Sequence, residues 1–286
     1  MGYIDLHIHT TASDGTLTPA EVVRYAKKKG LKAIAITDHD TIEGNREALE
    51  EGKKLGLDVL TGVEISVGCP YGTMHLLGYC IDIESSFIKE RLEFLQKVRS
   101  QRNIKIFDKL KGLGIGIDFN DVLEVAGGEQ VGRPHFAKAM IKKGYASTYQ
   151  DAFERFLKKG GPAYVDRFRF EPQEAIGIIL NCGGIPVLAH PFTLGDLKPK
   201  ELEEFVVDLI SLGLRGIEVF YPDHTDRQVA DYRYFAEKHG VLITGGSDFH
   251  GDSKPDVDIG IYNGDKEVSI ELVETMKNMQ QKQDRN

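Results

Sequence analysis

Short apolar segments with strand character alternate with helical segments along residues 1–83 and 166–286, and this alternation restricts the fold more than any other feature. Strands are predicted at 3–8, 32–36, 58–66, 73–80, 185–189, 215–220 and 241–244, with a last one near 257–262. Helices between successive strands allow those strands to run parallel. About seven mostly parallel strands therefore predict an α/β barrel or an open α/β sheet.

The helix that follows the first strand has clear signals at both ends. Thr18 is the expected N-cap, Pro19 occupies the first helical position, and Glu21 completes a capping box. Gly30 ends this helix. Further helices are predicted at 43–55, 172–182, 199–212, 226–239 and 269–280.

Between residues 84 and 165 the strand signals disappear, and helices are predicted at 86–111, 119–126, 134–143 and 148–159. This pattern predicts a barrel domain of residues 1–83 and 166–286 with an all-helical insertion, or cap, of residues 84–165. Residues 84–170 carry 17 Lys and Arg against 11 Asp and Glu, whereas the rest of the chain carries 19 against 33. A basic cap on an acidic barrel favours a small anionic substrate.

The composition excludes several classes of protein. No apolar run approaches the roughly 18 residues of a membrane span, and the N-terminus lacks the pattern of a secretory signal. A cytoplasmic location is therefore expected, and the three cysteines are expected to be reduced. The net charge of −8 argues against binding of long duplex DNA. The sequence leaves the oligomeric state open.

Histidines and carboxylates gather where the predicted strands end. Nine candidate metal ligands come from six strand ends: His7, His9, Asp14, His39, Glu64, His75, His190, Asp248 and His250. The active site of an α/β barrel is built at the C-terminal ends of its strands, so this placement favours the barrel over the open sheet.

Each of these residues alone also has an ordinary structural explanation. A single histidine on a strand is usually a core or surface residue, residues 38–40 (DHD) would suit a helix N-cap, and Glu64 would suit a paired core carboxylate. Their joint occurrence at strand ends favours a metal site. Asp5 shares the strand face of His7 and His9, and is expected to orient an imidazole.

Mixed imidazole and carboxylate ligands suit Mn, Fe or Zn better than Ca or Mg alone, and we expect Mn. Nine ligands exceed the needs of one ion, so two or three divalent ions are expected, with Glu64 as a bridge. Clustered ions of this kind suit hydrolysis, because one generates hydroxide from water while others bind phosphoryl oxygens.

The same residues lie in motifs that resemble those of the PHP (polymerase and histidinol phosphatase) superfamily. The motifs are DLHIHT and SDG, then ITDHD, GVEIS, His75, AHP and GSDFHG, in this order over the whole chain outside the insertion. The resemblance implies a distorted (β/α)7 TIM-like barrel with a trinuclear metal centre.

By position, the resemblance also assigns the candidate ligands to three ions. The first ion would be held by His7, His9, Glu64 and Asp248; the second by Glu64, His75 and His190; the third by Asp14, His39 and His250. Glu64, His190 and Asp248 are the expected catalytic residues.

The segment Gly132-Arg133-Pro134-His135 lies in the insertion and narrows the resemblance to the stand-alone PHP phosphoesterases. That group includes the 3′,5′-nucleoside bisphosphate phosphatase and the 5′→3′ exoribonuclease RNase AM. Arg133 offers a planar fork for phosphate and His135 a second donor, at the start of a helix whose N-terminus favours anions. A solvated arginine and a capping histidine are the alternative interpretation.

These features predict a metal-dependent phosphoesterase that removes the 3′-phosphate of nucleoside 3′,5′-bisphosphates and also trims short RNA from its 5′ end. The alternatives are a phosphomonoesterase for another metabolite such as histidinol phosphate, an amidohydrolase, and a PHP module that only braces a partner. His75 stands where an amidohydrolase would carry a lysine, and the complete ligand set argues against a non-catalytic module. The general acid for the leaving group stays open between His135 and a metal-bound water.

Overall fold

The computed structural model describes residues 3–126, 131–195, 197–262 and 268–283. The chain divides into two compact units, which are treated separately below. The barrel unit comprises residues 1–92 and 169–286, and the helical unit comprises residues 93–168.

The barrel unit is built on an eight-stranded sheet in the order β7-β6-β5-β4-β3-β2-β1-β8. An isolated parallel bridge between Ile8 and Phe249 links β1 to the segment after β7, so the sheet is nearly closed. This confirms the predicted distorted TIM-like barrel. The strands are β1 (Tyr3–Ile8), β2 (Ala33–Ile36), β3 (Asp58–Val67), β4 (Met74–Tyr79), β5 (Ile185–Leu188), β6 (Gly216–Phe220), β7 (Leu242–Gly245) and β8 (Val268–Ser269).

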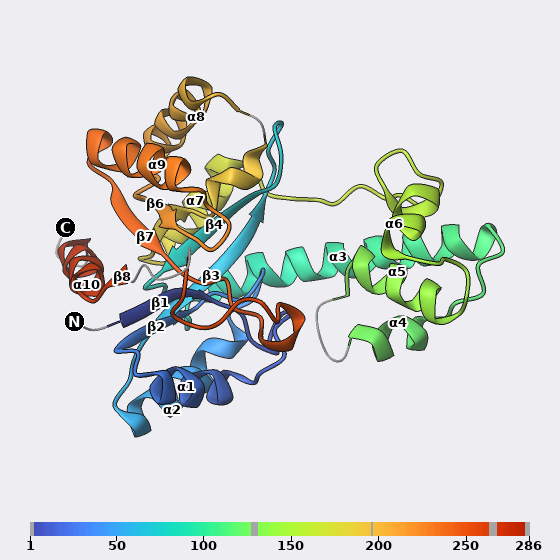
Figure 1. The fold of residues 1–286 in the computed structure, drawn as a ribbon, viewed down its shortest axis with the longest axis horizontal. Helices are drawn as coiled ribbons and strands as arrows, with labels where there is room; N and C mark the ends of the chain where they lie inside the picture. Colours follow the sequence, from blue (N-terminus) through green and yellow to red (C-terminus); the bar gives the residue numbers. More distant parts are fainter. Residues whose placement is uncertain (1–2, 127–130, 196, 263–267, 284–286) are drawn as a thin grey trace. The chain divides into compact units, whose positions relative to one another are not determined.

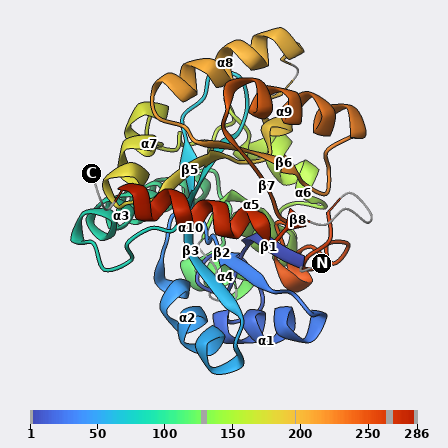
Figure 2. The same ribbon diagram turned by 90° about the vertical axis from the view of Figure 1, so that its left-hand side faces the viewer.

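Helices cover the sheet and also close one end of the barrel. Helices α1 and α2 lie side by side below the sheet in Figure 1, and α8 and α9 lie side by side above it. Figure 2 shows α10 lying across the end of the strands near the N-terminus. The helices are α1 (Pro19–Lys29), α2 (Glu43–Leu55), α7 (Pro172–Asn181), α8 (Pro199–Ser211), α9 (Asp226–His239) and α10 (Glu271–Gln283).

The barrel core follows from the two-residue alternation of the strands. Ala33 and Ala35 of β2 pack in one buried cluster with Val273 and Met276 of α10. The intervening Ile34, together with Ile36, packs against α1 in a second cluster. Since α10 covers one end of the apolar interior, polar side chains concentrate at the other.

The predicted capping of α1 is confirmed. The Thr18 hydroxyl accepts a hydrogen bond from the backbone N–H of Glu21 at 3.3 Å, and a Glu21 carboxylate oxygen accepts one from the Thr18 N–H at 2.9 Å. Gly30 ends the helix with a φ of 88°, a conformation that favours glycine.

The helical unit has its own apolar core, which includes Ile106, Phe136 and Met140. Its described elements are the long helix α3 (Ser86–Gly112), whose first turns belong to the barrel unit, α4 (Phe119–Ala126), α5 (Arg133–Lys142), α6 (Tyr149–Ala152) and a π-helical turn (Phe153–Leu157). Within the described residues, no helix combines the length and apolar character that a membrane span requires.

One predicted strand needs correction, and one strand departs from the parallel majority. Strand β4 runs antiparallel to both neighbours, because only six residues separate it from β3 and a parallel crossover needs a dozen or more. Residues 257–262 form turns that end in an isolated bridge residue rather than a strand, since Gly260 has a φ of 79°. The last strand is β8, which pairs antiparallel with β1.

Candidate metal centre

Glu64 lies at the centre of a group of histidines. Its side chain is 1% exposed, and one carboxylate oxygen, Oε2, is 3.3 Å from His7 Nε2, 3.1 Å from His9 Nε2 and 2.9 Å from His39 Nδ1. The other oxygen, Oε1, is 2.7 Å from His75 Nδ1 and 3.0 Å from His190 Nε2. A single buried carboxylate therefore faces five imidazoles that come from four strands or the residues directly after them.

His75 joins this group from a strand that runs in the opposite direction to its neighbours. It is the second residue of β4, so it lies at the beginning of its strand, whereas the other histidines lie at or after strand C-termini. Because β4 is antiparallel to β3 and β5, its beginning meets the edge where parallel strands end. The expectation that His75 lies at the C-terminal end of its strand is wrong, because His75 lies at the N-terminal end. It nevertheless lies at the expected edge of the barrel.

Asp14 forms a second centre of carboxylate contacts on the loop after β1. Its Oδ1 is 3.6 Å from His9 Nδ1 and 3.3 Å from His250 Nε2, and its Oδ2 is 3.8 Å from His39 Nε2. The His9 and His250 rings stack with centroids 4.1 Å apart. Asp14 thus extends the histidine group from the barrel interior towards solvent.

Within the described residues, three overlapping groups have ligand atoms within 4.8 Å of one another. The groups are His7, His9, Glu64 and Asp248; His9, Asp14, His39 and His250; and His39, Glu64 and His75. His190 lies outside these groups but contacts Glu64. The structure therefore brings all nine candidate ligands together.

The donor atoms fit divalent cations better than they fit one another. His7 Nε2, His9 Nε2 and Glu64 Oε2 are buried in the barrel unit without a well-formed hydrogen bond, although Glu64 Oε2 lies within ion-pair distance of both nitrogens. Buried polar atoms are normally hydrogen-bonded, so a shared set of such atoms indicates a bound ligand. Imidazole nitrogens with carboxylate oxygens are the donors that Mn, Fe and Zn prefer.

The charged groups of the cluster strongly shift one another's pKa values. Burial alone would raise the pKa of Glu64, but the charges of His39, His75 and His7 hold it well below its usual range. Burial alone would lower the pKa of His9, yet the carboxylates of Asp248 and Glu64, 3.0 and 3.1 Å from its Nε2, raise it to about 10. Perturbed groups of this kind concentrate at functional sites.

The backbone is strained at the same edge of the barrel. Asp40, His190 and Asp248 have φ angles of 51°, 24° and 55°, which side chains larger than glycine rarely adopt. They follow β2, β5 and β7 respectively. Strain that is kept at several strand ends of one site is typical of functional positions.

Glu218 on β6 is a site residue that the sequence analysis missed. It is fully buried; its Oε1 is 2.9 Å from His7 Nδ1, and its Oε2 accepts a hydrogen bond from the His190 N–H at 2.8 Å. The contact orients the His7 ring with Nε2 towards Glu64. The available signal was a lone carboxylate inside the apolar strand GIEVF.

Asp5 does not orient an imidazole, so that expectation is wrong. Its carboxylate accepts hydrogen bonds from the backbone N–H groups of His7, Ser247 and Gly260 at 3.1, 3.0 and 2.7 Å. A register shift in β1 between Asp5 and Ile8 breaks the alternation on which the prediction depended. Asp5 instead holds the loop after β7 against β1.

The two carboxylate oxygens of Asp248 have different partners: one faces the histidines and the other contacts Tyr221 and Lys254. Its Oδ1 lies 3.0 Å from His9 Nε2, inside the cluster. Its Oδ2 accepts a hydrogen bond from the Tyr221 hydroxyl at 2.7 Å and lies 2.6 Å from Lys254 Nζ. Tyr221 and Lys254 therefore fix the orientation in which Asp248 presents Oδ1 to the histidines.

Replacing Glu218 with glutamine should weaken metal binding about 10- to 100-fold, the usual effect of losing a group that orients a ligand. The amide keeps the size but loses the charge that fixes the His7 ring. Metal affinity, measured by competition with a chromogenic chelator, checks this. Glu203→Gln is the matched control, because Glu203 contacts His239 Nε2 at 3.0 Å on the surface. Equal affinities for both variants would contradict the role.

Arg133 and His135 lie in the helical unit, where each has a structural contact. Arg133 Nη1 donates to the Leu157 carbonyl at 3.1 Å. His135 Nδ1 accepts the Gly132 N–H at 3.0 Å, as a capping histidine does. A phosphate-binding role for these two side chains stays a prediction.

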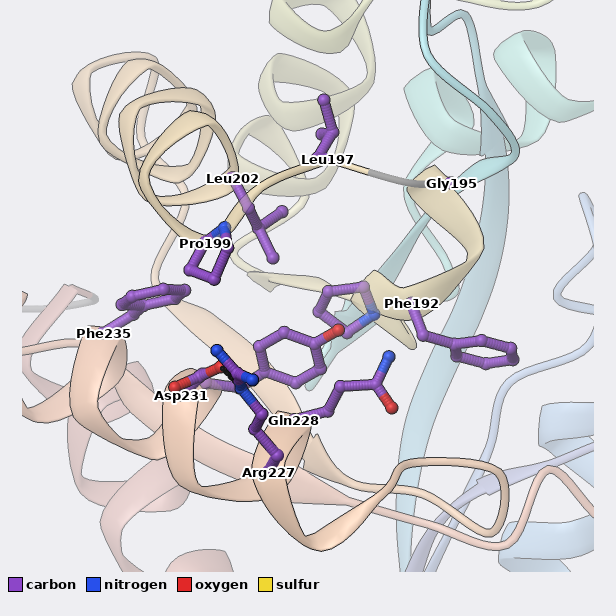
Figure 3. Close-up of a pocket in the computed structure, with 11 residues that line it drawn as sticks. Phe192, Gly195, Leu197, Pro199, Leu202, Arg227, Gln228, Asp231 and Phe235 are labelled. Carbon is purple, nitrogen blue, oxygen red and sulfur yellow. Dashed lines mark ion pairs between the residues drawn. The ribbon is translucent and has the colours of Figure 1, made fainter.

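A cavity of about 340 Å³ lies beside α8 and α9, and the residues that line it include none of the nine candidate ligands. Pro191 and Phe192, which follow His190, form part of its wall (Figure 3). Arg227 and Asp231 line it from α9 and form an ion pair at 3.8 Å. The cavity is therefore separate from the histidine cluster.

Comparison with known proteins gives consistent matches. A model of the PHP domain matches residues 5–158. A 3′,5′-nucleoside bisphosphate phosphatase of Chromobacterium violaceum is 31% identical, with 91% of each chain covered. A 5′-3′ exoribonuclease of Haemophilus influenzae is 34% identical over 86% of this chain and 89% of the relative.

A third relative has another substrate. The phosphoribosyl 1,2-cyclic phosphate 1,2-diphosphodiesterase of Eggerthella lenta is 32% identical over 86% of this chain and 94% of the relative. Among solved structures, a metal-dependent phosphoesterase from Bifidobacterium adolescentis superposes with a TM-score of 0.81 at 29% identity, covering 97% of this chain and 96% of that one. Fold and reaction class agree across these matches, whereas the substrates differ.

Proposed function

The chain belongs to the PHP domain family of metal-dependent phosphoesterases, and from that premise we propose that it removes the 3′-phosphate of nucleoside 3′,5′-bisphosphates. We also propose a slower 5′→3′ trimming of short 5′-phosphorylated RNA. The single observation that carries the hydrolytic function is Glu64, buried among five imidazoles that come from four different strands.

The proposed metal ligands are the nine residues of the cluster, with Glu64 shared between ions, and Mn is the expected metal. Divalent ions in such a site polarise phosphoryl oxygens and make hydroxide available at neutral pH. Glu218 fixes the His7 ring, and Tyr221 with Lys254 fixes Asp248. These contacts preorganise the cluster around the position of the reacting phosphate.

Hydrolysis forms a bond from a water oxygen to phosphorus and breaks the bond to the ribose 3′-oxygen, which takes up a proton. The products are the nucleoside 5′-monophosphate and inorganic phosphate. We propose that Arg133 and His135 bind the 5′-phosphate, which does not react. The 5′ end of a short RNA offers the same pair, a terminal phosphate and the next phosphate along the chain, so the same groups would recognise both substrates.

Adenosine 3′,5′-bisphosphate should be hydrolysed with a kcat/KM roughly 10- to 150-fold above that of 3′-AMP under Mn²⁺, because one charge-assisted phosphate contact contributes about 1.5–3 kcal/mol. The measurement is phosphate release from the bisphosphate, 3′-AMP, 5′-AMP and histidinol phosphate. The control variant is Arg155→Met, which removes another arginine of the helical unit and should leave this ratio of kcat/KM values unchanged. If 3′-AMP had the same kcat/KM as the bisphosphate, the protein would be a general phosphomonoesterase and the proposal would be wrong. A higher kcat/KM for a cyclic phosphate diester would instead favour a diesterase activity.

A further inference from the structure

A compact turn after β1, named the Asp14 turn, runs from Thr10 to Gly15. The Thr10 carbonyl accepts hydrogen bonds from the N–H groups of Ser13 and Gly15, both at 3.0 Å. A Cβ atom at Gly15 would lie 2.5 Å from the His9 carbonyl oxygen, so the turn needs glycine at this position. Since these bonds fix the shape of the turn, the position of its Asp14 depends on what anchors the turn to the barrel.

Asp38, which follows β2 and is fully buried, anchors the Asp14 turn. Its Oδ1 accepts hydrogen bonds from the Thr10 N–H at 2.7 Å and from the Ser13 hydroxyl at 2.6 Å. Its Oδ2 accepts one from the Thr10 hydroxyl at 2.8 Å. Asp38 does not cap α2, because that helix begins at Glu43. Its carboxylate is committed to the turn instead.

Helix α2 packs on the other side of this carboxylate. A Cβ atom at Gly44 would lie 2.6 Å from Asp38 Oδ2 and 3.0 Å from Thr10 Oγ1. The missing side chain therefore lets the first turn of α2 approach the bonded pair directly. Movement of the Asp14 turn would leave buried donors without an acceptor, which costs free energy.

Asp14 itself is not held by burial. Its side chain is 34% exposed, whereas that of Glu64 is 1% exposed. Asp14 Oδ1 nevertheless lies 3.3 Å from His250 Nε2, and Asp14 Oδ2 lies 3.8 Å from His39 Nε2. A carboxylate that is one-third exposed keeps such a position only if its backbone is fixed, so the placement of Asp14 depends on the turn and on its anchor.

We propose that Asp38 is a positioning residue for the outer part of the metal centre. Through the Asp14 turn it holds Asp14 at the place that an ion shared with His39 and His250 requires. The inference rests on the proposed function for the presence of divalent ions. It goes further by giving Asp38 control over one ion, whereas the ions bound around Glu64 do not depend on the turn.

The test counts the Mn²⁺ ions that the full-length protein binds after removal of metals with a chelator, in the absence of substrate. The electron paramagnetic resonance signal of free Mn²⁺ gives the binding curve. Asp38→Ala should bind one ion about 10- to 100-fold more weakly than the wild type and change the affinity of the others less than about threefold. Ser13→Ala removes one of the three hydrogen bonds and should weaken the same ion by a smaller factor.

Two further variants separate positioning from a loss of stability. Asp38→Asn keeps an oxygen for the Thr10 N–H and the Ser13 hydroxyl, and its amide can donate to Thr10 Oγ1, so it should restore most of the affinity. Thr37→Val is the matched control, because the buried Thr37 hydroxyl accepts the Ile8 N–H at 3.0 Å and so bonds β1 rather than the turn. This control should unfold at a lower temperature but bind the same number of ions with unchanged affinities.

The Mn²⁺ dependence of the rate gives a second readout. The activity of Asp38→Ala should keep rising at Mn²⁺ concentrations that saturate the wild type, because mass action restores the missing ion. Equal weakening of all ions, or a lower Tm with an unchanged Mn²⁺ binding curve, would show that Asp38 is a structural residue and would overturn the proposal. If Asp38→Ala does not fold, Ser13→Ala decides, and an unchanged binding curve for that variant overturns the proposal.

The outcomes are independent of hydrolysis, because binding is measured without substrate. A protein that loses one ion in Asp38→Ala but cleaves no nucleotide would refute the proposed function and leave the role of Asp38 standing. A nucleotide phosphatase whose Asp38→Ala variant binds every ion as the wild type does would keep the proposed function and overturn this inference.

Discussion

Replacing Glu64 with glutamine should lower kcat/KM by about 1,000-fold or more. Loss of one electrostatic group from an active site typically lowers the rate by about 100- to 1,000-fold, and Glu64 should lie at or above the upper end of that range. Glu64 faces five imidazoles through two oxygens, so its loss affects every part of the cluster at once. The amide is nearly the same size, but it cannot balance two cations. Phosphate release under saturating Mn²⁺ and the metal content of the purified variant are the measurements.

Two comparisons make the result specific. The loss should equal or exceed that of His75→Gln and His190→Gln, each of which removes only one partner of Glu64. Glu51→Gln is the control, because Glu51 is a largely buried carboxylate that pairs with Arg24 and Lys54 on the surface of the barrel unit. A Glu64→Gln enzyme with near-normal activity and more than one ion per chain would show that the bridging role is misassigned.

The second expected result concerns pH. The affinity of the metal-free protein for Mn²⁺ should rise at least about tenfold per pH unit between pH 7 and 9, or about 100-fold in total. The sign follows from His9, whose pKa is raised to about 10, so its imidazole is protonated throughout this range. A metal ion must displace that proton, and lowering the pH therefore weakens binding. The pKa of His7 is raised in the same direction.

Calorimetry in two buffers of different ionisation enthalpy measures the protons released when Mn²⁺ binds. At least one proton per chain should be released at pH 7.5, and His9→Gln should release fewer. His239→Gln is the control, since His239 pairs with Glu203 on the surface. Binding without proton release, at a constant affinity across this range, would show that the imidazoles are already neutral in the metal-free protein.

Local sequence patterns predicted much of the barrel and of the cluster. Two-residue alternation, capping signals such as Thr18 with Glu21, and the recurrence of histidines after apolar segments depend on neighbours in the chain. The order of the strands then carries these side chains to one edge of the sheet. For this reason the nine candidate ligands could be named before the structure was known, and the structure brings them together.

Only the tertiary structure decided which groups face one another. Glu218 contacts His7 across 211 residues because closure of the barrel brings β7 beside β1 and the neighbouring β6 carries Glu218 within reach of His7, and no local pattern encodes that contact. A register shift in β1 turned Asp5 away from the imidazoles, and the short connection before β4 reversed the strand that carries His75. Arg102 of α3 is only 7% exposed and donates to the Val165 carbonyl, a burial that no local helix pattern predicts. Local propensities determine elements, whereas burial and charge at a site depend on which distant elements pack together.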